Sequence, residues 1–161
     1  MTVEELTLIA TDFLRDTYGL PLEIPIVRNN RLRRVQGNYI TMHNDVPIVI
    51  EIAGIMFKYA DITVLIDTLK HELIHYAMHT LDKPYDDGHP EFEAELAKQG
   101  VSSTESTFVG IIHTFKCATC GTAEETRTAK HVRLYRNYTT ACCNSTVIYE
   151  GERIYNGTEV G

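Results

Sequence analysis

The sequence predicts an α+β fold: a small mixed sheet covered by helices, followed by a C-terminal β segment built around cysteines. Apolar residues recur at helical spacing after Thr2 and again through residues 61–81, and short β-branched segments lie between these two stretches. All four cysteines fall within residues 117–143. A chain of 161 residues is long enough for one hydrophobic core and a small appended unit.

The N-terminal part begins with a helix and continues as strands. Thr2 and Glu5 form a capping box, and apolar positions at helical spacing follow as far as Gly19, a residue typical of a helix C-terminus. The β-branched and apolar runs that come next predict three strands, at residues 22–27, 35–42 and 47–52.

The segment 61–81 is predicted to be a buried helix that carries a metal site. Asp61 caps its start, and His71 and His75 lie four residues apart, so both imidazoles face the same side. Glu72, next to His71, is placed to take a proton from a metal-bound water. Two histidines at this spacing can also serve packing or solubility alone. The apolar face of the helix favours zinc, because a metal satisfies all three polar groups in a buried setting.

A catalytic zinc needs a third protein ligand and an open position for water. His79 is eight residues from His71, roughly 12 Å along a helix axis, which is too far for both to bind one ion. His89 lies at the entry to a second predicted helix that begins with Pro90. Glu91 and Glu93, in the first turn of that helix, remain competing ligands.

The run TLKHELIHYAMHTLDKPYDDGHPEFEAEL resembles the core of the SprT-like zinc metallopeptidases, relatives of the Spartan DNA–protein crosslink protease. Residues 30–40 are similar to that family's strand-turn-strand lead-in, and a C-terminal cysteine segment extends the likeness to about residue 150. The resemblance implies a zincin-like core in which His71, His75 and His89 bind a catalytic zinc and Glu72 is the base. The chain has Gly88-His89-Pro90 where many members have a His-Gly pair, which leaves the third ligand open.

The cysteines predict a second, structural zinc site of the zinc-ribbon type. Cys117 and Cys120 have the spacing of a zinc knuckle, whereas Cys142 and Cys143 are adjacent and break the usual second pair. Three interpretations remain: all four cysteines bind zinc, one of the last two acts with His131, or the ribbon has lost its metal. We favour the first. Strands are expected near residues 111–116, 131–138 and 145–150.

These observations divide the chain into a metallopeptidase core at 1–107, a zinc-ribbon-like segment at 108–150 and a loose tail at 151–161. The polar, aperiodic run 101–107 marks the boundary between the first two parts.

The net charge of −7 argues against a protein that coats nucleic acid by bulk attraction. DNA contacts would therefore be local, and a solvated charged surface is the alternative interpretation of the same residues. The candidates are the cluster Arg28, Arg31, Arg33 and Arg34, and the C-terminal residues Lys116, Arg127, Lys130, Arg133 and Arg136. No apolar run is long enough for a membrane span, and the N-terminus lacks the layout of a signal peptide. We therefore expect a cytoplasmic protein with no membrane partner.

The predicted function is that of a zinc-dependent metalloendopeptidase acting on a protein or peptide substrate, with an association with DNA implied by the resemblance. Pro47 suggests that the strand 47–52 is unpaired on one side, so we expect it to hold the substrate as an added strand, with core packing as the alternative. Tyr76, His79 or Tyr85 could stabilise the oxyanion. Two other functions remain open: a nucleic-acid-associated zinc-binding module with an idle or regulatory metal site, and a zinc hydrolase of non-peptide amides.

Overall fold

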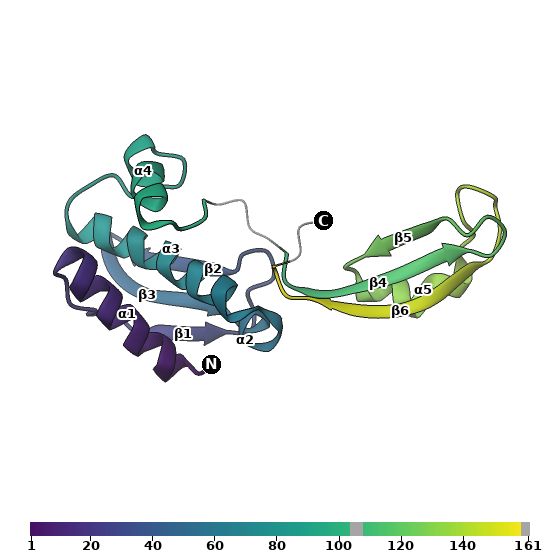
Figure 1. Ribbon diagram of the computed structural model, residues 1–161, viewed down its shortest axis with the longest axis horizontal. Coiled ribbons are helices and arrows are strands. Elements are labelled where there is room, and N and C mark those ends of the chain that lie inside the picture. The colour runs from purple at the N-terminus through teal and green to yellow at the C-terminus, as the bar shows by residue number, and fades with distance from the viewer. Residues whose placement is uncertain (104–107, 159–161) are drawn as a thin grey trace. The chain divides into compact units, whose positions relative to one another are not determined.

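The computed structural model describes residues 1–103 and 108–158, and its contacts divide the chain into two compact units, Met1–Thr107 and Phe108–Gly161. Each unit contains a three-stranded sheet and helices, so the mixed α+β architecture predicted from the sequence is present (Figure 1). Part of the predicted boundary run, residues 104–107, lies outside the described residues. Within the described residues, no helix combines the length and apolar character needed to cross a bilayer.

The sheet of the first unit contains β1 (Ile26–Asn29), β2 (Gly37–Met42) and β3 (Val46–Ala53). The strand order is β1-β3-β2, with β3 parallel to β1 and antiparallel to β2. The first strand lies later in the chain than predicted, because the two prolines of the preceding segment remove N–H donors from it. Among the described residues β2 pairs only with β3, so β2 is an edge strand.

The expectation that residues 47–52 are unpaired on one side is wrong for residues 50–52, because β3 lies between β1 and β2 there. Pro47 is compatible with this place because β1 pairs only with the second half of β3, from Ile50 to Ala53. The missing N–H of Pro47 therefore lies in the half of β3 that β1 does not reach. Within the described residues, β2 offers a free edge along its whole length, whereas β3 does so only before Ile50.

Helices α1 (Val3–Tyr18) and α3 (Ile62–Thr80) cover the same face of this sheet (Figure 1). The predicted capping box at the start of α1 is confirmed: Thr2 accepts from the Glu5 N–H, and the Glu5 side chain accepts from the Thr2 N–H. Helix α2 (Gly54–Tyr59) connects β3 to α3, and α4 (Pro90–Gln99) packs against the end of α3. The core between these elements is aliphatic and fully buried, formed by Leu6, Ala10, Leu14, Ile50, Ile52, Leu69 and Leu73.

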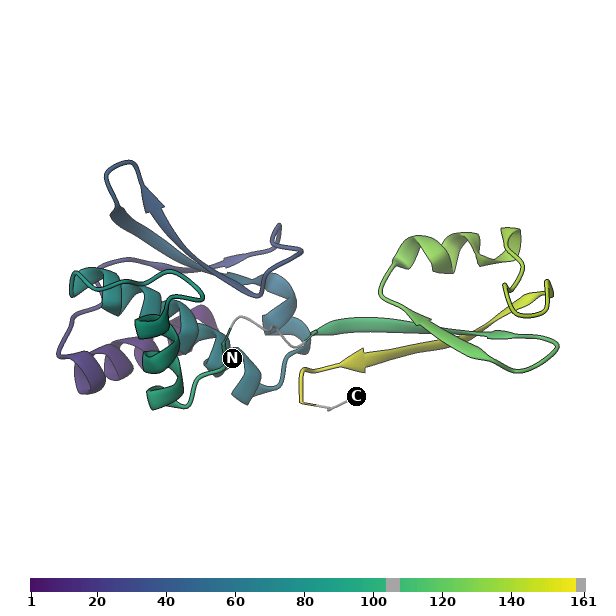
Figure 2. The same ribbon diagram turned by 90° about the horizontal axis from the view of Figure 1, so that it is seen from above.

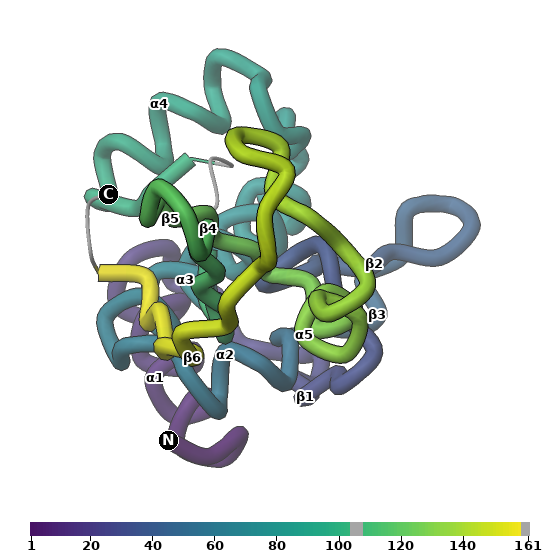
Figure 3. Tube along the Cα trace, turned by 90° about the vertical axis from the view of Figure 1, so that its right-hand side faces the viewer, coloured from purple at the N-terminus to yellow at the C-terminus, as the bar shows by residue number. Residues whose placement is uncertain are grey.

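The β2–β3 hairpin projects beyond the helices, as two views of the chain agree (Figures 2 and 3). At its tip, Asn44 and Asp45 have φ angles of 69° and 64°, a conformation that asparagine and aspartate adopt at low cost. The apolar side chains flanking the tip are solvent-exposed, at 61% for Met42 and 52% for Val46.

The second unit contains β4 (Gly110–Cys117), β5 (Ala123–Thr126) and β6 (Val147–Tyr155) in the order β5-β4-β6, all antiparallel. Helix α5 (Ala129–Leu134) and the 3₁₀ turn η1 (Tyr135–Asn137) lie on one side of this sheet (Figure 2).

Two features of the second unit differ from the sequence predictions. The strand expected at 131–138 is wrong: this stretch is occupied by α5 and η1, because alanine, lysine, arginine and leucine favour a helix over the alternating pattern of Val132 and Leu134. In addition, β6 continues through Tyr155, past the expected start of a loose tail at Gly151. Its last residues pair with the first half of β4.

Candidate metal centre

Helix α3 carries His71 and His75, and the packing of the helix fixes where these side chains lie. Asp61 accepts a hydrogen bond from the Thr63 N–H at 2.9 Å and so fixes the start of the helix. The aliphatic side chains at Leu65, Leu69 and Leu73 are buried, which anchors one face of the helix in the core. His75 is only 8% exposed, so its imidazole is positioned within the protein rather than in bulk solvent.

Three ligand atoms converge beside this helix. The Nε2 atoms of His71 and His75 are 3.1 Å apart, and Asp87 Oδ1 lies 3.2 Å from the first and 3.4 Å from the second. With Zn–N distances of about 2.0–2.1 Å, two ligands of a tetrahedral zinc are separated by about 3.3 Å. The three spacings therefore match the edges of a zinc coordination tetrahedron.

The other ring nitrogens define the tautomers of these histidines. His71 Nδ1 lies 3.0 Å from the Ser102 carbonyl oxygen, and His75 Nδ1 lies 2.5 Å from the Tyr85 carbonyl oxygen. A carbonyl can only accept, so each Nδ1 carries a proton and donates it, which leaves a lone pair on each Nε2. Burial lowers the pKa of His75 and favours the neutral ring that a metal requires. Two lone pairs and a carboxylate facing one point repel each other unless a cation lies between them, so this donor set fits zinc.

Glu72 lies beside the two histidines in a buried position, with 7% of its surface exposed. Burial raises the pKa of its carboxyl group to about 7, although the nearby His71 and the Tyr39 backbone act in the opposite direction. The first residue of β2, Gly37, packs directly on this side chain: a Cβ at Gly37 would be 2.6 Å from Glu72 Oε1. Sequence analysis did not single out Gly37, although a glycine inside a strand pattern is a signal of close approach.

Asp87 supplies the third ligand atom beside His71 and His75. It was not among the third ligands expected from the sequence. His89 is the N-cap of α4, and its Nδ1 accepts a hydrogen bond from the Glu91 N–H at 3.3 Å. Glu93 accepts from the Gly88 N–H. None of these three side chains is part of the cluster of ligand atoms found among the described residues. The assignment of His89 as a ligand stays a prediction.

Comparisons with known proteins bear on the part of the chain that carries this site. The model of the SprT-like family matches residues 3–109. A relative described as "Protein SprT-like" from Staphylococcus carnosus (strain TM300) is 32% identical over 108 residues, which are 65% of this chain and 69% of the relative. The chain belongs to the SprT-like family. The family match covers α3, α4 and the sheet, and it ends at the start of the cysteine-containing unit.

Aromatic side chains surround the histidines of this SprT-like chain. The Tyr39 hydroxyl lies 2.6 Å from His79 Nδ1, and the Tyr85 ring stacks on His79 with centroids 4.4 Å apart. The Tyr85 hydroxyl donates to Asp45 at 2.7 Å, which ties the loop after α3 to the hairpin tip. Tyr76 instead donates to the Pro21 carbonyl at 3.1 Å and has a structural role. The expected role of His79 or Tyr85 as an oxyanion donor stays a prediction.

The four cysteines form a second cluster, outside the region matched by the family model. Their Sγ atoms all lie within 4.8 Å of one another, and Cys120 and Cys142 are 3.4 Å apart. A hydrogen bond from the Thr140 hydroxyl lowers the pKa of Cys117 to about 6, which favours the thiolate that zinc binds. Asn144, directly after the adjacent pair, has a left-handed φ of 47°.

This arrangement fits a four-thiolate zinc site, because Zn–S distances of about 2.3 Å place tetrahedral ligands about 3.8 Å apart. The alternative ligand His131 is not part of the cluster. Its Nδ1 lies 3.1 Å from the Thr126 hydroxyl instead.

Proposed function

We propose that this SprT-like protein is a zinc-dependent metallopeptidase that hydrolyses peptide bonds. The observation that supports this most is the convergence of the His71 and His75 Nε2 atoms, 3.1 Å apart, beside the buried carboxyl group of Glu72. The family resemblance supplies a zincin-like core as the framework, and the four-cysteine cluster would hold a second, structural zinc.

Two histidines and one further ligand would hold the catalytic zinc. The resemblance assigns His89 to the third position, whereas Asp87 occupies that place in the geometry. Measuring zinc per chain in His89→Ala and Asp87→Asn, each with the cysteines intact, decides between them. The variant that lacks the true ligand should contain one zinc ion per chain, and the other variant should retain two.

The chemistry follows from the side chains around the site. When bound, zinc lowers the pKa of a coordinated water to about 7 and stabilises developing negative charge. Glu72 accepts the proton of the attacking water and returns it to the leaving amine. His79, or Tyr85 once its hydroxyl has turned away from Asp45, would donate a hydrogen bond to the oxyanion. The carbonyls of Ser102 and Tyr85 keep the histidine rings in orientation.

The substrate would bind in an extended conformation along β2. This strand has a free edge within the described residues, and Gly37 at its start touches Glu72. Main-chain hydrogen bonds to such an edge need no particular substrate sequence. This strand replaces residues 47–52 as the proposed substrate-binding element.

The test compares zinc-loaded wild type with Glu72→Gln on an unfolded protein such as reduced casein and on a small amide. Glu72→Gln should retain its zinc and lose activity by about 10²–10⁴-fold, the usual contribution of a general base. Glu4→Gln, a conservative change at the exposed start of α1, is the matched control. Normal turnover by Glu72→Gln would contradict the proposal, and cleavage of the small amide alone would point to a non-peptide hydrolase.

We also propose that the second unit contacts DNA through α5 and η1. Lys130, Arg133 and Arg136 are exposed at three-residue intervals there, and none of them forms an ion pair within the described residues. When such side chains bind DNA phosphates, they displace the counterions condensed on the DNA, which favours binding at low salt. Replacing Lys130 and Arg133 with glutamine should weaken binding of a single-stranded oligonucleotide and reduce its salt dependence. Unchanged affinity would argue against this surface.

A further inference from the structure

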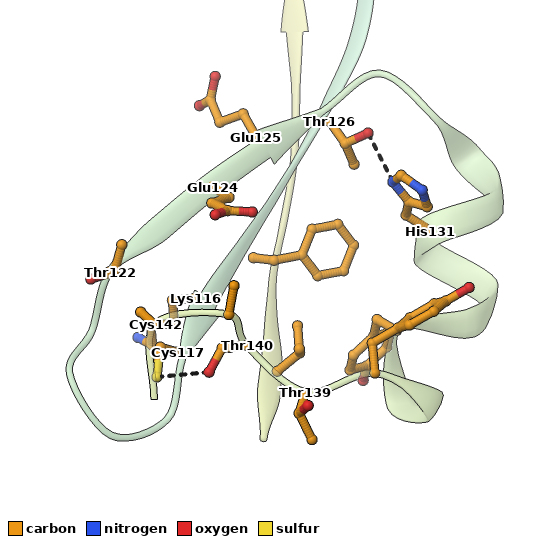
Figure 4. A pocket seen from close by; sticks show the side chains of 15 residues that line it. Lys116, Cys117, Thr122, Glu124, Glu125, Thr126, His131, Thr139, Thr140 and Cys142 are labelled. Atoms are coloured by element: carbon orange, nitrogen blue, oxygen red, sulfur yellow. Dashed lines mark hydrogen bonds between the residues drawn. The ribbon is translucent and has the colours of Figure 1, made fainter. Parts of the chain in front are cut away.

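The second unit contains a pocket of about 480 Å³ next to the four-cysteine cluster, and Cys117 and Cys142 are part of its lining (Figure 4). It lies between β5, α5 and the loop that leads to β6, and its volume is in the range of small-ligand sites, about 300–1,000 Å³. The lining combines aromatic rings with hydroxyl groups. Those that carry the argument are Phe115, Glu124, Thr126, His131, Tyr135 and Tyr138.

The apolar part of the pocket is an aromatic surface. Phe115 and Tyr135 have ring centroids 5.7 Å apart, and both rings also pack on Tyr149 behind them, at 5.1 and 6.0 Å. Tyr138, at the mouth of the pocket, is 51% exposed. Aromatic faces carry partial negative charge and attract cations, arginine in particular, because its planar guanidinium group also stacks on them.

Among the charged side chains that line the pocket, one carboxylate forms no ion pair within the described residues. Lys116 is paired with Glu150, and Glu125 is paired with Arg153 at 3.3 Å. Glu124 faces Phe115 across the β4–β5 ladder and has no ion-pair partner among the described residues. In the close view, the Glu124 carboxylate is turned toward the other lining side chains, whereas Glu125 points away from them (Figure 4).

The hydrogen-bonding groups favour a donor-rich ligand. Thr139 and Thr140 place hydroxyl oxygens around the pocket. Both donate their protons within the protein, to Asn144 and Cys117, so toward a ligand their oxygens act as acceptors. The cations of α5 and η1, at Lys130, Arg133 and Arg136, are not part of the lining, which argues against a phosphate inside it.

We propose that this pocket binds an arginine side chain of a partner peptide, with the guanidinium group against the aromatic rings and the Glu124 carboxylate. This site is separate from the proposed peptidase site and does not depend on its activity. An arginine offers five N–H donors and an apolar stem, which match the acceptors and the ring surface respectively.

The test is an NMR titration of the zinc-loaded 161-residue chain with a short peptide that has one arginine between glycines. The same peptide with citrulline keeps the shape and removes the charge. The arginine peptide should shift the amide signals of Thr126, Tyr138 and Thr139, and the citrulline peptide should bind at least about tenfold more weakly, because charge-assisted hydrogen bonds are lost. This comparison requires no mutation, so it does not depend on the folding of a variant.

The matched variants are Glu124→Gln and Glu125→Gln, neighbours on opposite faces of β5. Glu124→Gln should weaken arginine-peptide binding at least about tenfold, and Glu125→Gln should leave it within about twofold. Equal binding of the two peptides, an equal loss in both variants, or no binding at about 1 mM peptide would overturn the proposal. Signal shifts in the pocket caused by oligothymidine but not by the arginine peptide would likewise overturn it, in favour of a nucleobase site.

Discussion

The contact between Gly37 and Glu72 makes Gly37→Ala a sharp test of the proposed active site. The added methyl carbon would lie 2.6 Å from Oε1, 2.8 Å from Cγ and 3.0 Å from Cδ of Glu72, and ordinary contacts begin at 3.4 Å. Either β2 or the Glu72 side chain must therefore shift by almost 1 Å. Because Glu72 is buried, it has little free space into which its whole side chain can move.

The expected loss of stability in Gly37→Ala is small, whereas the expected loss of peptidase activity is large. Overpacking by one methyl group costs about 1–3 kcal/mol of unfolding free energy, which a domain of ordinary stability tolerates. A displacement of about 1 Å at a catalytic group can lower the rate by about 10²-fold. Gly37→Ala should thus remain folded with its zinc bound and lose most of its peptidase activity.

The assay measures kcat/KM on casein, zinc content and urea unfolding for the same preparation. Asn38→Ala is the matched control, because Asn38 is exposed on the same strand and Glu51 is its partner in the sheet. The Asn38→Ala variant should retain activity. Wild-type kcat/KM in Gly37→Ala would refute the reasoning, and so would an equal loss of activity in Asn38→Ala.

Three further predictions concern stability and metal. Thr2→Ala removes the capping box of α1 and should cost about 1 kcal/mol in urea unfolding, whereas Thr2→Ser, which keeps the hydroxyl, should cost much less. Phe92→Ala should lower the free energy of unfolding by about 3–5 kcal/mol, because Phe92 is fully buried. It should also reduce zinc content, because the Phe92 ring stacks on His75 with centroids 4.2 Å apart. An unchanged unfolding midpoint would contradict this prediction. Chelation of zinc should lower hydrogen-exchange protection of β4 near Cys117 more than that of α1, which binds no metal, and equal effects on both would argue against the structural zinc.

The helical part of the site could be predicted because its geometry is local. The spacing of His71 and His75 on one helix determines that they share a face, and the apolar residues around them predict that the helix is buried. Asp87 could not be predicted in the same way. Its position depends on the path of the loop after α3, which is held by the Tyr85 hydroxyl on Asp45 and the His75 bond to the Tyr85 carbonyl.

The strand errors have a related cause. The sequence predicts that 47–52 is a strand, but its central place depends on pairing with β1, which lies more than twenty residues earlier in the chain. Likewise, β5 is made of Ala123, Glu124, Glu125 and Thr126, a polar stretch without alternation, and forms a strand only because β4 pairs with it. The clustering of Cys142 and Cys143 with Cys117 and Cys120 could be expected from sequence, whereas the backbone that brings adjacent cysteines together could not.

The proximity of β2 to Glu72 has a consequence for selectivity. A peptide that pairs with the free edge of β2 can shift along it only by whole residues. The distance between this strand and the carboxyl group of Glu72 is set by Gly37, which has no side chain. The bond to be cut would then be chosen by backbone alignment and not by the identity of neighbouring side chains. Such a protease would discriminate between substrates by how readily a segment becomes extended and unfolded, so well-folded proteins would be spared without any recognition sequence.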